Sequence, residues 1–262
     1  MTFLKFRASA LVAVALVLGC AGAPGGLRAD RFTVPSRLVH RDLEQVAIRA
    51  GAHRPLLVLL HGRSGAPADL LGLDLQTALR RLGSRAPDIL LVNGDDASYY
   101  HDRKGGKWGS YVLREAIPAG IRRLGADPRR VAIGGFSMGG FGALVLARIA
   151  PGRFCAVGAH SAALWRTGAE TPAGAFDDAA DFGRHDLFSA AATRRLYRVP
   201  VWIDVGTEDP FRAADTAFAK TLQAHGVHAR FHVWPGGHEY SYWHAHVMAY
   251  LRFYAAALRS CR

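Results

Sequence analysis

Ser137 is the residue of this chain whose surroundings best fit a catalytic nucleophile. It stands in Gly135-Phe136-Ser137-Met138-Gly139, a G-x-S-x-G motif between an apolar stretch at 130–135 and a small-residue helix predicted for 138–150. A strand–turn–helix of this kind lifts the serine Oγ clear of the sheet, and the helix N-terminus favours the anion that forms there. A motif this short can occur by chance in an unrelated chain. The strand and the helix predicted on either side of it are what make the assignment specific.

A serine nucleophile needs a base, and the base needs an acid that orients it. In enzymes with this motif the order along the chain is serine, acid, histidine, each on a loop that follows a strand. His238 lies in such a loop, within Pro235-Gly236-Gly237-His238-Glu239, and is the predicted base. For the acid we prefer Asp209, because Pro210 ends the loop beside it, and its neighbour Glu208 is the alternative.

The third requirement is a pair of donors for the negative charge that develops on the substrate oxygen. The backbone N–H of Met138, directly after the nucleophile, is one expected donor. The other is expected from the loop after the first buried strand, which reads Leu60-His61-Gly62-Arg63, and the N–H of Arg63 is our prediction.

Short apolar runs alternate with helical patterns along the rest of the chain. The runs read as strands at 56–60, 89–92, 130–135, 155–158, 201–205 and 230–234, and helical spacing predicts helices at 69–82, 108–124, 138–150 and 241–258. Pro118 must then lie at a kink or at a helix start. This alternation predicts an α/β fold, a mostly parallel sheet with helices on both faces.

We expect a single domain over residues 31–262. An antiparallel edge hairpin is predicted for 31–49, and 164–198, which fits neither period, is interpreted as an inserted cap or long loop.

The N-terminus has the pattern of an export signal. Lys5 and Arg7 precede a short apolar stretch, and small residues follow, which predicts a secretory signal peptide over 1–23. Two processing sites compete: Ala21-Gly22-Ala23, and a lipobox-like Leu18-Gly19-Cys20 in which Cys20 would carry a lipid. In both cases we expect an exported protein, secreted or held at the cell envelope.

The chain is basic, with a formal charge of +12 from 33 basic and 21 acidic residues. Its arginine pairs, 80–81, 122–123, 129–130 and 194–195, are far apart in the sequence, so we expect no nucleic-acid binding. Two interpretations remain: association with anionic envelope polymers, and a coding bias toward arginine that has no role in binding. Half of the residues are hydrophobic, which excludes a disordered chain.

No cofactor or metal site is predicted. His244 and His246 are two residues apart, a spacing that does not put both rings on one helix face. Cys155 and Cys261 are the two cysteines expected after export. They would either pair in an oxidising compartment or, since Cys155 stands in an apolar stretch, leave a buried thiol.

Four motifs in this order resemble the α/β-hydrolase superfamily, within it the esterases that include S-formylglutathione hydrolases, feruloyl and acetyl esterases and secreted mycolyltransferases. The resemblance rests on Leu59-Leu60-His61-Gly62, Gly135 to Gly140, Asp204 to Asp209 and Gly236 to Trp243. It implies Ser137 as nucleophile, Asp209 as acid, His238 as base, and Arg63 and Met138 as oxyanion donors. By the same resemblance His61, Tyr100 and Trp108 are expected beside the substrate.

Three functions follow from these residues. The first is a secreted serine esterase that hydrolyses a small-molecule, carbohydrate or lipid ester through an acyl-enzyme on Ser137. The second is an acyltransferase of the mycolyltransferase type, which uses the same residues and passes the acyl group to a sugar alcohol. The third is a non-catalytic envelope-binding protein on a hydrolase scaffold.

Overall fold

The computed structural model describes residues 27–261. The predicted signal peptide, 1–23, and the proposed lipidation site at Cys20 lie outside these residues. Within the described residues no helix combines the length and the apolar character that crossing a bilayer requires.

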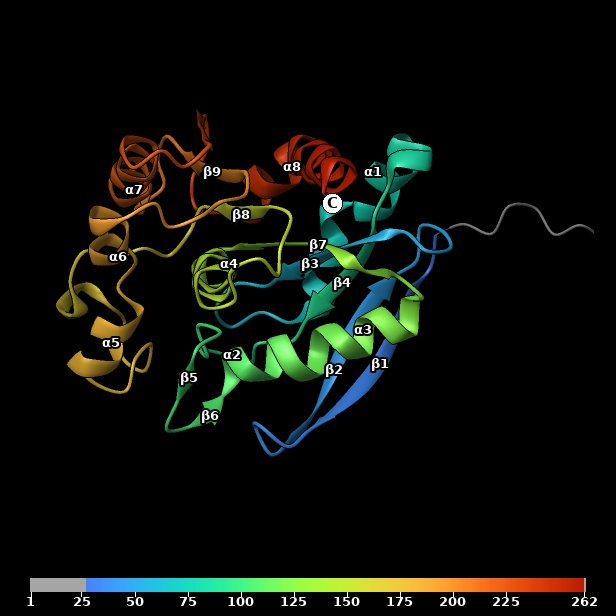
Figure 1. Ribbon diagram of the computed structural model, residues 1–262, viewed down its shortest axis with the longest axis horizontal. Helices are drawn as coiled ribbons and strands as arrows, with labels where there is room; N and C mark the ends of the chain where they lie inside the picture. Colours follow the sequence, from blue (N-terminus) through green and yellow to red (C-terminus); the bar gives the residue numbers. More distant parts are fainter. Residues whose placement is uncertain (1–26, 262) are drawn as a thin grey trace, which may run out of the picture.

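An eight-stranded sheet forms the centre of the molecule (Figure 1), and its strand order is β1-β2-β4-β3-β7-β8-β9-β10. The strands are β1 (Ala29–Ser36), β2 (Arg41–Ile48), β3 (Pro55–Leu60), β4 (Asp88–Val92), β7 (Asp127–Phe136), β8 (Val157–His160), β9 (Val201–Gly206) and β10 (Ala229–Trp234). From β4 to β10 every neighbouring pair is parallel, and β1 and β2 add an antiparallel edge. The predicted hairpin at 31–49 and the mostly parallel α/β sheet are thus confirmed.

Helices cover both faces of this sheet. They are α1 (Leu75–Leu82), α2 (Trp108–Tyr111), α3 (Ile117–Leu124), α4 (Met138–Ile149), α5 (Ala179–His185), α6 (Leu187–Thr193), α7 (Arg212–Ala224) and α8 (Tyr240–Ser260). Buried residues of α1 and α8 form one core cluster with the sheet, and those of α3, α4 and α7 form another on the opposite face. β3 is apolar at every position because both faces of the sheet are covered there.

Two predicted helices differ from the structure. The 69–82 segment is not one helix: a 3₁₀ segment spans Pro67–Leu73, Asp74 takes a positive φ of 56°, and only then does α1 begin. The 108–124 segment is helical but passes through a π segment, Val112–Ala116, between α2 and α3. Pro118 lies at the start of α3, as predicted, directly after the π segment.

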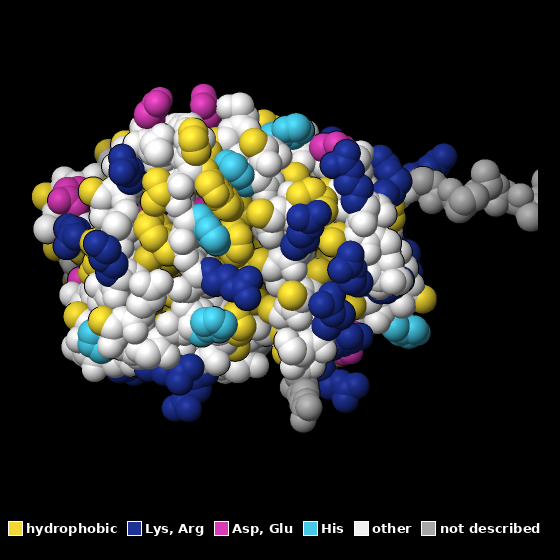
Figure 2. Space-filling model, turned by 90° about the horizontal axis from the view of Figure 1, so that it is seen from above, with side chains coloured by type: hydrophobic (Ala, Val, Ile, Leu, Met, Phe, Trp, Pro, Cys, Tyr) yellow, Lys and Arg dark blue, Asp and Glu magenta, His cyan; other side chains and the backbone are white. Residues whose placement is uncertain are grey.

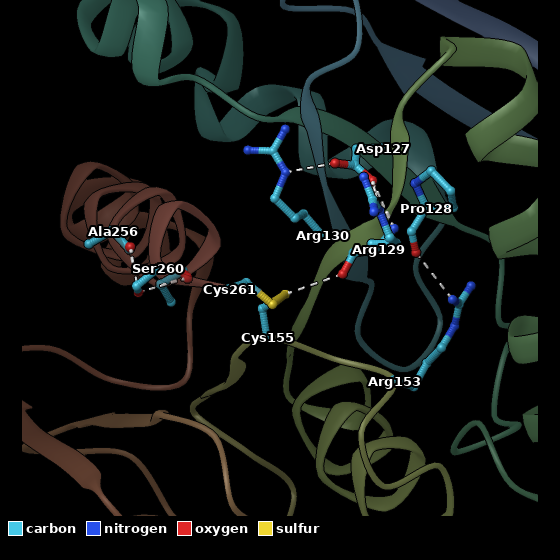
Figure 3. The surroundings of a disulfide bond; sticks show 10 residues. Asp127, Pro128, Arg129, Arg130, Arg153, Cys155, Ala256, Ser260 and Cys261 are labelled. Carbon is cyan, nitrogen blue, oxygen red and sulfur yellow. Dashed lines mark hydrogen bonds and ion pairs between the residues drawn. A yellow bond between two sulfur atoms is a disulfide. The ribbon is translucent and has the colours of Figure 1, made fainter.

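The strand predicted at 155–158 begins two residues later, since Cys155 precedes β8 and forms a disulfide with Cys261 at the end of α8 (Figure 3). Of the two alternatives for these cysteines, the paired one is correct. The segment at 164–198 lies between β8 and β9 and contains α5 and α6 at one end of the molecule (Figure 1). A small ribbon of β5 (Asp102–Arg103) and β6 (Gly106–Lys107) lies nearby.

Candidate active site

Ser137 occupies the tight turn between β7 and α4, with φ at 54° and ψ at −116°. This is a region that residues with a side chain seldom adopt. The turn closes because two glycines flank it. A β-carbon on Gly135 would lie 2.3 Å from the carbonyl oxygen of Gly139, and one on Gly139 would lie 2.2 Å from that of Leu60. The strained serine at the end of a strand is therefore built by its neighbours, as the motif predicts.

His238 lies within hydrogen-bond distance of both predicted partners. Its Nε2 is 2.8 Å from the Oγ of Ser137, and its Nδ1 is 2.9 Å from Oδ2 of Asp209. The N–H of Phe211 donates to Oδ1 of Asp209 at 2.8 Å, so both carboxylate oxygens are held. Glu208 is exposed. The geometry thus pairs the histidine with Asp209.

The loops that carry the acid and the base are fastened to each other. The N–H of Glu208 donates to the carbonyl oxygen of Gly236 at 2.9 Å, and the N–H of Thr207 donates to that of Trp234 at 2.8 Å. These bonds join the ends of β9 and β10, which are neighbouring parallel strands. Residues 29 positions apart in the sequence are thereby held in one rigid unit.

The environment keeps Asp209 ionised. Burial works to raise the pKa of this carboxyl group, but the hydrogen bonds from His238 and from the Phe211 N–H outweigh burial, and the pKa is lowered. A carboxylate accepts hydrogen bonds only, so His238 must carry its proton on Nδ1 and present a free Nε2 to Ser137. This is the tautomer that a general base requires.

The predicted oxyanion donors come from two segments next to the serine. Met138 is the first residue of α4, where a backbone N–H has no partner within the helix. The chain at Gly62 runs beside the nucleophile, since a β-carbon there would lie 3.5 Å from Cβ of Ser137. Arg63 follows directly, at the position from which its N–H was expected to point toward the site.

His61 fixes the segment that contains Gly62 and Arg63 through two hydrogen bonds of its ring. Its Nε2 accepts a hydrogen bond from the N–H of Gly94 at 2.9 Å, and its Nδ1 donates to the carbonyl oxygen of Gly62 at 2.7 Å. Burial lowers the pKa of His61, which keeps the ring neutral and able to bridge in this way. Tyr100 donates its hydroxyl proton to the carbonyl oxygen of His61 at 3.1 Å.

The expectation that His61, Tyr100 and Trp108 touch substrate is therefore corrected. Their exposed fractions are 1%, 0% and 3%, so their side chains lie in the core below the site. The sequence placed them near the strand ends, but it does not show which way a side chain points. Phe211, Trp165 and Trp243 lie closer to the reacting groups: the rings of Phe211 and Trp243 are 5.2 and 5.4 Å from that of His238, and Trp165 is 5.7 Å from Phe211.

A buried polar cluster behind the nucleophile was not foreseen. Asp204, which the sequence placed inside a strand, accepts a hydrogen bond from His160 at 2.6 Å and further ones from the side chains of Trp202, Tyr242 and Tyr250. The carbonyl oxygen of His160 in turn accepts the N–H of Ser137 at 3.0 Å. This cluster fixes the backbone on which the serine turn rests. An aspartate within an apolar strand, Trp202-Ile203-Asp204-Val205, was the signal in the sequence.

Three metal-binding side chains meet outside this site, namely His101, Asp181 and His185. Asp181 is completely buried, and its oxygens accept hydrogen bonds from the Asp177 N–H, from His101 and from Arg184. These bonds satisfy the carboxylate, and a guanidinium lies where a cation would bind. The cluster fastens α5 to the loop before β5, and we assign no metal to it.

Comparison with models of protein families identifies the family of this chain. Residues 84–254 match the model of a family described as "Putative esterase". The chain belongs to this esterase family.

The chain is also 30% identical over 176 residues to the diacylglycerol acyltransferase/mycolyltransferase Ag85A of Mycobacterium tuberculosis and Mycobacterium bovis. The match covers 58% of this chain and 52% of the relative, so the chain spans about half the length of these relatives.

Solved structures of the same fold include a ferulic acid esterase, with a TM-score of 0.77 at 22% identity, covering 88% of this chain and 97% of that one. An S-formylglutathione hydrolase from Agrobacterium tumefaciens gives 0.72 at 18% identity, with 89% and 96% covered. MPT51 of Mycobacterium tuberculosis gives 0.69 at 20% identity, with 88% and 99% covered. At these identities the likeness establishes the α/β-hydrolase fold.

Proposed function

We propose that this member of the esterase family is an exported serine esterase that hydrolyses a carboxylic ester through an acyl-enzyme on Ser137. The observation that carries the proposal is the continuous hydrogen-bonded line from the Oγ of Ser137 through His238 to Asp209, at 2.8 and 2.9 Å. A serine at this strained turn, with a base of the right tautomer behind it, is the arrangement that acyl transfer needs.

The chemistry runs in two halves. His238 takes the proton as Ser137 Oγ attacks the ester carbonyl, and the N–H groups of Met138 and Arg63 hold the tetrahedral oxyanion. The alcohol leaves with the proton from His238, and water, activated by the same histidine, then releases the acid. Asp209 orients the ring and stabilises the imidazolium form throughout.

The apolar wall beside the base indicates the substrate's character. Phe211 and Trp165 are half-buried with their rings 5.7 Å apart, and the ring of Trp165 packs on that of the buried Tyr99 at 5.4 Å. Such rings favour an apolar acyl or aromatic group over a charged one. The preferred substrate is therefore an ester whose acyl part is hydrophobic.

Acyl transfer is the second candidate, favoured by the similarity to the Ag85A acyltransferases. Water and a sugar alcohol compete for the same acyl-enzyme, and the triad serves both. The reaction product distinguishes the two functions: a hydrolase releases the free acid, and a transferase forms an acylated sugar.

Export is part of the proposal. The Cys155–Cys261 disulfide supports it, since such bonds persist in oxidising compartments. Expression of the full chain with analysis of the N-terminus of the product distinguishes cleavage after Ala23 from a lipidated Cys20.

The catalytic proposal is tested with the chain from Pro24 onward and p-nitrophenyl esters of increasing acyl length. We expect turnover that rises with acyl length and falls by about 10⁴-fold or more in Ser137→Ala. Ser84→Ala, at an exposed serine, is the matched control and should keep full activity.

A fluorophosphonate should add one covalent adduct to the native chain and none to Ser137→Ala. Turnover that survives in Ser137→Ala would overturn the assignment, and product analysis with added glucose or glycerol separates hydrolysis from transfer.

A further inference from the structure

In the folded protein the four arginine pairs, which are spread over more than a hundred residues of the sequence, lie at one edge of the sheet. In a parallel sheet the strands all begin at one edge, and the helices that return the chain all end there. The pairs 80–81, 122–123 and 194–195 lie at the ends of α1, α3 and α6, and 129–130 lies in the first half of β7. All four pairs therefore lie at the edge opposite to Ser137 and His238. We call it the basic edge.

Further arginines from the connections at the same edge complete it. The basic edge consists of Arg28, Arg49, Arg54, Arg80, Arg81, Arg85, Arg122, Arg123, Arg129, Arg130, Arg148, Arg153, Arg194, Arg195, Arg198 and Arg259. Figure 2 shows dark-blue side chains on the α1 side of the face seen from above, with others over the rest of that face, and Figure 3 shows Arg129, Arg130 and Arg153 around the disulfide.

Few acidic side chains balance this charge, and Asp186 at the start of α6 is one whose charge acts on Arg148. In the described residues of these connections the aspartates are Asp30, Asp88 and Asp127. Asp30 and Asp127 are already in ion pairs with Arg123 and Arg130, and Asp88 is completely buried. Arg81 and Arg122, by contrast, are exposed to solvent.

Helix dipoles explain only part of this accumulation. A cation in the last turn of a helix is favourable, which accounts for the arginines that end α1, α3 and α4. The helix dipole does not account for Arg28, Arg54 or Arg85, because none of them lies at the end of an α-helix.

The basic edge also has recesses of headgroup size. One hollow of about 500 Å³ has a mostly apolar lining that includes Phe154 and Leu196, with Arg148, Arg194, Arg195 and Arg198 around it. Another, of about 240 Å³, is lined by Arg54, Arg85, Arg130 and Arg259 among other residues. The guanidinium of Arg148 already donates one hydrogen bond, to the carbonyl oxygen of Arg184 at 2.7 Å, while its buried Nε has no hydrogen-bond partner. Guanidinium groups in such recesses match the bidentate geometry of phosphate oxygens.

The chain's N-terminal side joins the body at this same edge. Ala29 pairs with Ile48 at the end of β2, and Arg28 lines a hollow with Arg49 and Arg123. The segment that holds Cys20 and the predicted cleavage site therefore attaches where the charge is concentrated. At the other end of the chain, the disulfide holds Cys261 beside the start of β8, which lies at the same edge.

We propose that the basic edge docks on a membrane surface that contains anionic phospholipid headgroups, with the candidate active site turned away from the bilayer. A membrane is favoured over nucleic acid on two grounds: the charge of the basic edge, and the export proposed above, since the described chain begins at this edge with Arg28 and Ala29. The orientation implies that the ester substrate reaches Ser137 from the aqueous side. Docking does not depend on the esterase activity, so each proposal can fail alone.

The test is sedimentation of the chain from Pro24 onward with vesicles of phosphatidylcholine, with and without phosphatidylglycerol. We expect binding to the anionic vesicles alone, weakened by added salt. Replacing one arginine of each pair by glutamine, in Arg81→Gln/Arg122→Gln/Arg129→Gln/Arg194→Gln, should weaken binding about fivefold per residue and several-hundredfold in all.

The control removes the same charge from the opposite side of the molecule, in Arg37→Gln/Lys104→Gln/Lys107→Gln/Arg166→Gln, and should bind the vesicles like the native chain. Hydrolysis of a soluble p-nitrophenyl ester by both variants reports that they are folded. Equal loss of binding in the two variants, equal binding to neutral vesicles, or tighter binding to duplex DNA than to anionic vesicles at the same salt concentration would each overturn the proposal.

Discussion

Gly206 lies so close to Gly236 that a β-carbon on Gly206 would stand 2.2 Å from the carbonyl oxygen of Gly236. Gly206 ends β9 ahead of the loop that carries Asp209, and Gly236 opens the loop that carries His238. The contact thus sets the distance between the acid and the base.

Gly206→Ala is expected to separate these two loops. Because a shift of about 1 Å in a catalytic group costs on the order of 10²-fold, we expect kcat/KM to fall by about 10- to 100-fold. Gly183→Ala is the matched control, since a β-carbon at Gly183 has no atom within 4 Å and the helix gains from alanine. Equal activities for the two variants would contradict this view of the Gly206–Gly236 contact.

The two acidic neighbours are expected to differ sharply in importance. Asp209→Asn removes the acceptor that fixes the tautomer of His238, so kcat should fall by about 10⁴-fold. Glu208→Gln, at an exposed side chain, should change kcat by less than about threefold. Steady-state kinetics on one p-nitrophenyl ester compare them. A larger loss in Glu208→Gln would reassign the acid.

The disulfide is expected to contribute to stability and not to catalysis. It closes a loop with a sequence separation of 106 residues, and its loss in Cys155→Ser/Cys261→Ser should lower the free energy of unfolding by about 2–4 kcal/mol. Urea unfolding with and without reductant measures this. The native chain should respond to the reductant and the double variant should not, while esterase activity at 25 °C stays the same.

Stability is expected to fall in mild acid because of His101. Burial, and next the neighbouring His185, lower the pKa of His101 to about 4 from an ordinary value of 6.5. The unfolded chain therefore takes up a proton first, so this stability is complete above about pH 6.5 and is lost as the pH falls toward 4.

The loss from His101 should be about 3 kcal/mol, and His101→Gln should flatten the dependence of unfolding free energy on pH across this window. His53→Gln, at an exposed histidine, should leave the dependence as it is. Identical pH profiles for the native chain and His101→Gln would show that the residue does not titrate as described.

Much of the fold could be predicted because the sheet is buried on both faces. The strand from Leu56 to Leu60 is apolar at every position. Ser137 lies between a strand and a helix, which is the order that the motif demands. Segment 69–82 was harder, since its leucines fit a helical period in both halves while Asp74 breaks the helix with a positive φ. Periodicity reports which residues face the core and not how the backbone turns between them.

The sequence by itself determined the parallel α/β architecture, the strained Ser137 turn and the candidates His238 and Asp209, because each depends on local patterns of apolar and small residues. Only the tertiary structure decided that His61, Tyr100 and Trp108 are buried, that Cys155 pairs with Cys261, and that the dispersed arginine pairs share one edge. The reason is geometric. Local pattern sets the type of each element, but side-chain direction and the meeting of residues far apart in the chain follow from how the elements pack.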